Sequence, residues 1–433
     1  MRRRARRPGT GRASARHRGT AAPRPPRPGV AQHPGRGDQR VPRRHRRPGG
    51  VLSERRRLAA ALGRHARRRP QRAGPGLPRT SGRRRARAYL AAVSSPLRVW
   101  RQWPAGLETV PAGALLERLG GPTLLHLSGA ADPPVFLSVL LHGNETSGWD
   151  GLRRLIADTI GRGVPLPRSL IVFVGNVRAA AAGVRTLPEQ NDFNRIWRGS
   201  AGVDGALANA VLTELDGRRL FAAVDLHNNT GQNPHYAVLT QLAPDNYGLA
   251  YLFDDQAVYI REPDTVMTRV FDGRCPAVTL ELGPVGDPRC ADRAYDFLSR
   301  MLTLDRIPPS DRARLRVYRT EARVHVPDDV AFSFAGDGLD TPLVLTGGLE
   351  AVNFHELPAG TEFAATALPA ARALDVRDVG HAPATGRYFE SRGGRLVLRE
   401  AVIPAMYTVD PAVVRQDCLC YFMTRMAPEA LSG

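Results

Sequence analysis

The chain of 433 residues contains no lysine, so all 62 of its Lys/Arg residues are arginine. No apolar run approaches the roughly 20 residues that a membrane-spanning helix needs, which argues against a membrane partner. With 4 cysteines the chain cannot build a disulfide framework, and Cys418 and Cys420 are spaced wrongly for a zinc ribbon or a CxxC redox pair. Reduced thiols are therefore expected, and they predict a cytoplasmic protein.

Acidic residues are almost absent from the first 90 residues, which hold 29 arginines against Asp38 and Glu54 and so carry a charge of +27. The rest of the chain holds 33 basic and 39 acidic residues, a charge of −6. The overall +21 and the isoelectric point near 11.1 therefore belong to one segment. Residues 1–88 also lack aromatic residues, and so little apolar surface cannot offset the entropy of ordering. We predict that this segment is disordered.

Three interpretations of residues 1–88 stay open. An Arg-rich segment can bind nucleic acid through phosphate contacts. It can also be an organelle transit peptide, although Pro and Gly interrupt any amphipathic helix, and no apolar core follows the first arginines as in a secretory signal. The favoured interpretation is GC-rich DNA read in frame upstream of the true start, because the composition changes abruptly near Ala88. Nucleic acid is therefore not an expected partner.

After residue 88 the chain alternates between short apolar runs and amphipathic stretches. Such runs are typical of strands covered on both faces, and their alternation with helices predicts an α/β fold with a mostly parallel mixed sheet flanked by helices. Beyond Pro308-Pro309-Ser310 the pattern favours strands. We predict a catalytic domain at 89–312 and a smaller β-rich domain at 313–433. The expected strands are 135–141, 169–175, 221–226 and 277–282, and the expected helices are 149–160, 205–215 and 291–304.

Two histidines and a glutamate follow the predicted strands in a pattern typical of a metal site. His142 and Glu145 lie three residues apart on the turn that leaves the first strand, and His227 ends the third. Catalytic zinc often takes two His and one Glu and leaves a fourth position for water. Asp225 points to the same side of its strand as His227, so it can support the ring of that histidine. We therefore expect one Zn²⁺ per chain.

Further polar side chains are expected near the same sheet edge. Glu281 lies in an apolar run, where a carboxylate is costly unless it has a function, and it fits a general base that takes a proton from water at the metal. Arg195 offers a planar fork for a substrate carboxylate, and Asn194 adds a donor. Arg185 is expected to polarise the scissile carbonyl. All of them lie near the carboxyl ends of strands, where open α/β sheets bind ligands.

The series HGNE, DFNR, DLHNNTG and LELG, in this order, resembles the aspartoacylase/succinylglutamate desuccinylase branch of the zinc carboxypeptidase superfamily. The resemblance is strong over about residues 130–300 and looser over 314–433. It implies zinc ligands at His142, Glu145 and His227, a general base at Glu281, a substrate-carboxylate pair at Asn194 and Arg195, and an arginine facing the carbonyl oxygen at Arg185. The chain departs from the family in having Phe193 where Leu is usual.

These observations predict a zinc-dependent amidohydrolase that cleaves a small N-acyl amino acid or related amide bearing a carboxylate. A metallocarboxypeptidase acting on peptides is the alternative within the superfamily. Nucleic-acid binding through residues 1–88 is the alternative from another class. The sequence marks neither the acyl group nor the oligomeric state.

Overall fold

The structure is a computed structural model, and it describes residues 96–311 and 314–431. The predicted disorder of residues 1–88 falls outside the described residues. In the part described, no helix is both long and apolar enough to cross a bilayer.

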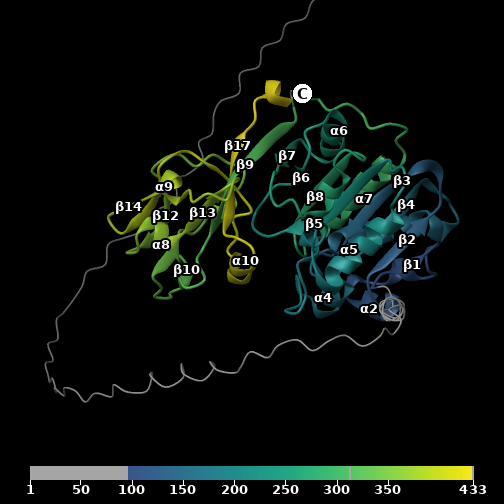
Figure 1. Cartoon of the computed structure of the whole chain (residues 1–433), viewed down its shortest axis with the longest axis horizontal. Helices are drawn as coiled ribbons and strands as arrows, with labels where there is room; N and C mark the ends of the chain where they lie inside the picture. Colours follow the sequence, from purple (N-terminus) through teal and green to yellow (C-terminus); the bar gives the residue numbers. More distant parts are fainter. Residues whose placement is uncertain (1–95, 312–313, 432–433) are drawn as a thin grey trace, which may run out of the picture. The chain divides into compact units, whose positions relative to one another are not determined.

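A mixed sheet of 12 strands organises most of the described chain (Figure 1). In order across the sheet, its strands are β1 (Arg98–Trp100), β2 (Thr123–Leu127), β4 (Leu166–Val174), β3 (Gly129–Val139), β5 (Ala222–Asn229), β8 (Ala277–Pro284), β6 (Tyr236–Leu239), β7 (Gln256–Tyr259), β9 (Arg316–His325), β17 (Cys420–Arg425) and β16 (Ile403–Ala405), while β13 (Asp375–Asp378) pairs with β9.

The four expected strands are confirmed as the parallel centre of this sheet, in the order β4, β3, β5 and β8. Their boundaries differ from the apolar runs, since β3 and β4 begin before them and β5 and β8 continue beyond them. His227 and Glu281 therefore lie inside strands rather than at their ends. Because both residues belong to hydrogen-bonded strands, the direction in which each side chain points is fixed by the sheet.

Helices cover both faces of the parallel centre. The α-helices are α2 (Leu115–Leu119), α3 (Ser147–Asp158), α4 (Val177–Ala182), α5 (Gly202–Glu214), α6 (Pro244–Phe253), α7 (Pro288–Leu302), α8 (Ala370–Ala373), α9 (Thr385–Tyr388) and α10 (Pro411–Gln416). The three expected helices are α3, α5 and α7. Because side chains alternate along a strand, Leu137 lies in the same core cluster as Trp149 of α3 on one face, and Phe136 lies in the same core cluster as Leu207 of α5 on the other. Both faces of the central strands are therefore buried.

Short 3-10 helices complete the connections. They are η1 (Leu107–Thr109), η2 (Ala112–Ala114), η3 (Ile160–Arg162), η4 (Phe193–Arg195), η5 (Met267–Phe271), η6 (Leu349–Val352) and η7 (Pro428–Leu431). Of these, η4 carries the Asn194-Arg195 pair, and its first turn is capped by the side chain of Asp192. This cap fixes the backbone of η4 and with it the positions from which the Asn194 and Arg195 side chains project.

The C-terminal region is β-rich, as predicted, and it contributes to two sheets. A separate five-stranded sheet has the order β10 (Phe332–Phe334), β11 (Leu343–Leu345), β12 (Glu362–Thr366), β15 (Arg395–Leu398) and β14 (Phe389–Arg392). The other strands extend the large sheet, because β9 pairs in parallel with β7 and in antiparallel fashion with β17 (Figure 1). The extension brings C-terminal side chains onto the sheet that carries His227 and Glu281.

Candidate metal centre and active site

The three predicted metal ligands meet at the carboxyl ends of β3 and β5. His142 and Glu145 lie on the loop between β3 and α3, and His227 lies near the end of β5. These residues are 2%, 4% and 3% exposed, and one ligand atom from each lies within 4.8 Å of the others. Two imidazoles and a carboxylate in such a buried cluster are the donor set that zinc prefers.

Both histidine rings are oriented in the same way toward Glu145. The Nδ1 atoms of His142 and His227 lie 2.8 Å from the two different oxygens of the Glu145 carboxylate. Their Nε2 atoms face outer carboxylates, at 3.0 Å for Asp192 and 2.8 Å for Asp225. An Nε2–H donated to an outer carboxylate leaves the Nδ1 lone pair toward the centre, where a cation can take it. The arrangement therefore fits a divalent ion.

The two outer carboxylates differ in how far the sequence predicted them. Asp225, which the sequence paired with His227, is fully buried, and it accepts hydrogen bonds from His227 and from the Ser138 hydroxyl of β3. The contact of Asp192 with His142 was not predicted. Asp192 is the first residue of the DFNR motif, so the motif did mark it. Because Asp192 lies 50 residues from His142 along the chain, the sequence gave no reason to pair the two.

The charges of the cluster shift the pKa values of its members. Burial would raise the pKa of Glu145, but the adjacent charges of His142 and His227 outweigh it and hold this pKa well below its usual value. Burial would likewise lower the pKa of His227, but Asp225 and Glu145 raise it well above the usual value. The cluster is therefore a buried network of opposite charges.

Close packing of the backbone positions the HGNE loop. Leu140 adopts a left-handed conformation with φ 58°, which turns the chain out of β3 before His142. A Cβ on Gly143 would lie 2.2 Å from the backbone of Ala179 in α4, so only glycine allows this approach. On the other side, the Asn228 backbone N–H donates to Glu145 Oε2 at 3.2 Å. Neighbours from two elements thus fix the Glu145 carboxylate.

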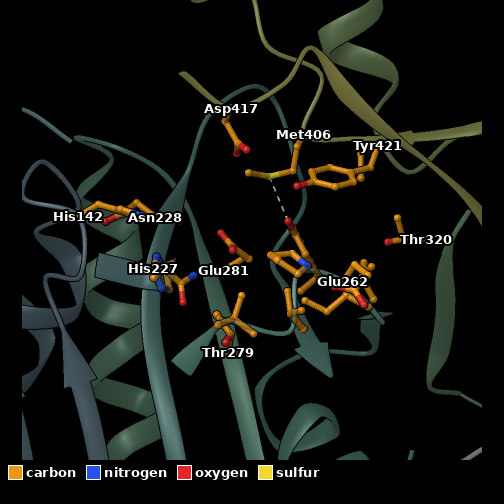
Figure 2. A pocket seen from close by; sticks show the side chains of 18 of the residues that line it. His142, His227, Asn228, Glu262, Thr279, Glu281, Thr320, Met406, Asp417 and Tyr421 are labelled. Carbon is orange, nitrogen blue, oxygen red and sulfur yellow. Dashed lines mark hydrogen bonds between the residues drawn. The ribbon is translucent and has the colours of Figure 1, made fainter. Parts of the chain in front are cut away.

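Glu281 lies beside His227, because the two residues are partners in the parallel register of β5 and β8 (Figure 2). Its Oε2 atom is buried and has no hydrogen-bond partner. Burial and the like charge of Glu145 raise its pKa to about 7, although His227 acts against that rise. A carboxyl group with this pKa and a free oxygen can accept and return a proton near neutral pH.

The predicted arginines and Asn194 line the same pocket. Arg185 donates to Glu145 Oε1 at 3.0 Å and to Asp192 Oδ2 at 3.4 Å, so it is held against the candidate ligand Glu145. The Arg195 guanidinium donates to the Asn194 carbonyl at 3.1 Å. The Asn194 Oδ1 atom accepts from the Met267 backbone N–H, which leaves the amide nitrogen as the donor end of that side chain.

C-terminal strands form the side of the pocket opposite the metal group (Figure 2). No sequence signal marks this side, because its residues carry no metal-ligand or catalytic pattern and several of them come from the C-terminal region. Besides the predicted residues, the pocket lining includes Tyr236, Val238, Val258, Ile260, Thr320, Ala405, Met406, Asp417, Tyr421 and Met423.

Comparison with known proteins gives the following matches. Residues 131–304 match the model of the succinylglutamate desuccinylase/aspartoacylase catalytic domain. A succinylglutamate desuccinylase from Yersinia enterocolitica is 38% identical over 79 residues, which are 18% of this chain and 23% of that protein. The aligned stretch is therefore less than a quarter of the relative's length.

Two solved structures match part of the chain. Succinylglutamate desuccinylase from Chromobacterium violaceum is 18% identical with a TM-score of 0.45, over 68% of this chain and 85% of that chain. Murine aminoacylase 3 is 16% identical with a TM-score of 0.47, over 69% of this chain and 97% of that chain.

Proposed function

We propose that the chain is a zinc-dependent hydrolase that cleaves the amide bond of small N-acyl amino acids, since residues 131–304 match the model of the succinylglutamate desuccinylase/aspartoacylase catalytic domain. The observation that carries this proposal is the convergence, in one pocket, of the His142-Glu145-His227 group, the partnerless carboxyl oxygen of Glu281 and the Arg195 guanidinium. The reaction consumes one water and yields a carboxylate and an amine.

His142, Glu145 and His227 are the residues that would hold the ion. Zinc in such a site supplies positive charge that polarises a carbonyl oxygen and makes a water molecule more acidic. Asp192 and Asp225 keep the two imidazoles oriented by accepting from their Nε2 atoms.

Glu281 is the general base in this proposal. Its free Oε2 atom takes the proton of the attacking water, while the water oxygen forms the new bond to the amide carbon. The same carboxyl group then returns the proton to the leaving nitrogen as the C–N bond breaks. A pKa of about 7 suits both steps, because the group must bind and release a proton in each cycle.

The polar side chains around this centre orient the substrate. Arg195 binds a carboxylate of the amino acid through its planar fork, and the Asn194 amide nitrogen adds a donor. Arg185, held beside Glu145, faces the carbonyl oxygen on which negative charge develops during attack. The substrate is therefore expected to be a small molecule with a free carboxylate.

Metal content and activity, measured together, test the proposal. The purified chain should contain about one zinc per chain and should hydrolyse N-acyl amino acids. His227→Ala should lose both properties, whereas His381→Ala, at an exposed histidine, should lose neither. A chain without zinc, or full activity in His227→Ala, would contradict the proposal. Turnover of C-terminal dipeptides alone would identify a carboxypeptidase instead.

A further inference from the structure

The pocket has an apolar wall, which we define as Tyr236, Val238, Val258, Ile260, Met406 and Met423. We propose that this apolar wall binds a hydrocarbon group of the substrate, so that the chain prefers N-acyl amino acids whose second group is aliphatic or aromatic over those that carry a second carboxylate. The inference rests on the proposed function and specifies the substrate class of the same site.

The sheet itself builds the apolar wall next to the catalytic group. Tyr236 of β6 is the register partner of Glu281, and Val238 is the partner of both Thr279 in β8 and Val258 in β7. Because alternate side chains of a strand share one face, Tyr236 and Val238 stand on the face of Glu281 and Thr279. A group that extends from an amide held at Glu281 therefore passes onto apolar side chains.

Met406 completes the apolar wall from the C-terminal region. Its backbone has φ 59°, and its N–H donates to the Asn233 Oδ1 atom at 2.8 Å, which holds this unusual conformation in place. Its sulfur accepts a hydrogen bond from the Tyr236 hydroxyl at 3.1 Å (Figure 2). The methionine side chain is therefore fixed over the pocket before any ligand arrives.

Charge in the pocket disfavours a second carboxylate. Among the described lining residues, the guanidinium groups are Arg185 and Arg195, and Arg185 is already bonded to Glu145. The acidic side chains beyond the catalytic group are Glu262 and Asp417, of which Asp417 is ion-paired with Arg323. A substrate whose first carboxylate occupies Arg195 would leave its second one against apolar groups and the carboxylate of Glu262, and such burial is costly.

A substrate panel measured with the zinc-loaded full chain tests this inference. We expect kcat/KM for N-acetyl-L-phenylalanine or N-hexanoylglycine to exceed that for N-acetyl-L-aspartate and N-succinyl-L-glutamate by at least tenfold. The first compound carries its apolar group on the amino acid, and the second carries it on the acyl chain. Comparing the two shows whether the apolar wall binds the amino-acid side chain or the acyl group. Along the favoured series, each added methylene should raise kcat/KM by roughly three- to fourfold until the wall is covered.

A binding measurement provides a readout besides activity. Calorimetry should show that L-phenylalanine or hexanoate binds more tightly than L-aspartate and succinate. Ile260→Arg should reverse the order, because it places a cation on the apolar wall. Val164→Arg at an exposed position, where Val164 is 51% exposed, is the matched control and should leave the order unchanged.

The outcomes separate the two proposals. If dicarboxylates are the better substrates and ligands of the unsubstituted chain, the inference is wrong while the proposed function stands. If no amide is cleaved by the zinc-loaded chain, the proposed function is wrong, and the ligand order still decides whether the wall selects apolar groups. If Ile260→Arg fails to fold, the comparison of ligands on the unsubstituted chain decides.

Discussion

At the scale of single residues, Glu281 differs from the other acidic groups of the site. Glu145, Asp192 and Asp225 each lie within 3.0 Å of a histidine ring nitrogen, whereas the Oε2 atom of Glu281 is buried without a partner. Burial of such a group is costly, so its presence in an apolar strand calls for a function. A proton acceptor is the function that its position beside His227 supports.

Replacing Glu281 with glutamine keeps the shape of the side chain and removes the proton acceptor. We expect kcat to fall by roughly 100-fold or more, while the zinc content stays near one per chain. Glu350→Gln is a suitable control, because Glu350 also has a buried, partnerless oxygen but lies outside the pocket lining. Loss of zinc from Glu281→Gln would mean that Glu281 is itself a ligand.

The same substitution has a pH-dependent effect on the metal-free chain. The pKa of Glu281 is raised from 4.5 to about 7, so the folded state binds its proton more tightly than the unfolded state does. The stability from that proton is fully present below about pH 4.5 and is lost as the pH rises through about 7. At pH 8 the charged carboxylate should therefore cost about 3 kcal/mol, which Glu281→Gln removes.

Thermal melts with a chelator check this expectation. The melting temperature of Glu281→Gln should exceed that of the unsubstituted chain at pH 8, and the difference should shrink toward zero near pH 4.5. A difference that does not depend on pH would show that burial does not raise this pKa.

Arg195 is the residue that we expect to bind the carboxylate of the substrate. Arg195→Lys keeps the charge but loses the planar fork, so catalysis should lose about 1.5–3 kcal/mol with substrates that bear a free carboxylate. The loss should nearly vanish with their neutral amides. Arg198→Lys, at an exposed arginine nearby, is the control. Equal losses on charged and neutral substrates would make Arg195 a structural residue.

At the scale of elements, the sequence predicted the parts that obey a strict pattern. The four central strands are nearly continuous apolar runs, since helices cover both faces, and α3, α5 and α7 carry their apolar residues at helical spacing. The end of β5 was missed because this strand continues through the polar residues His227 and Asn229, and the end of β8 was missed because it continues through Gly283 and Pro284, which are typical of a turn. These residues break the apolar pattern, so the pattern could not reveal them as strand.

The loop after β5 is held against the C-terminal region. Gly231 has φ 79°, and a Cβ there would lie 2.1 Å from the Tyr407 carbonyl oxygen. Close approach of this loop places Asn233 where it holds the backbone of Met406. Gly231 is therefore required for both its conformation and its lack of a side chain.

Gly231→Ala should destabilise the chain by at least about 2 kcal/mol, because it adds a steric clash to the cost of a left-handed conformation. Gly217→Ala is the matched control, since Gly217 has φ 66° and a Cβ there would meet nothing within 4 Å, and it should cost about 1 kcal/mol. Denaturant unfolding measures both. Equal costs would show that the approach of Tyr407 relaxes.

At the scale of the whole molecule, the pocket combines residues that the sequence could identify with residues that it could not. The predicted metal ligands, Glu281 and the Asn194-Arg195 pair lie in short motifs within or after the central strands. The apolar wall comes partly from Met423 of β17 and from Met406, which follows β16, and the pairing of β17 with β9 joins residues about 100 positions apart along the chain. Apolar residues so far apart along the chain carry no local sequence signal. The proposed substrate preference could therefore be inferred only from the structure.

Zinc binding should stabilise the whole chain, because the ligands come from the β3–α3 loop and from β5 and are brought together only by folding. At a free zinc concentration 1,000 times the dissociation constant, the gain is about 4 kcal/mol. A chelator should lower the melting temperature of the unsubstituted chain and leave that of His227→Ala nearly unchanged. The same shift in both would show that zinc does not stabilise the fold through this group.

The register that joins β5, β8 and β6 has a consequence for motion. His227, Glu281 and Tyr236 are successive partners across three hydrogen-bonded strands, so they form one row with the strand spacing of about 4.8 Å between neighbours. No hinge lies within that row, and its members can separate only if the sheet hydrogen bonds break. The backbone amides of this row should therefore be among the slowest in the chain to exchange their hydrogens with solvent.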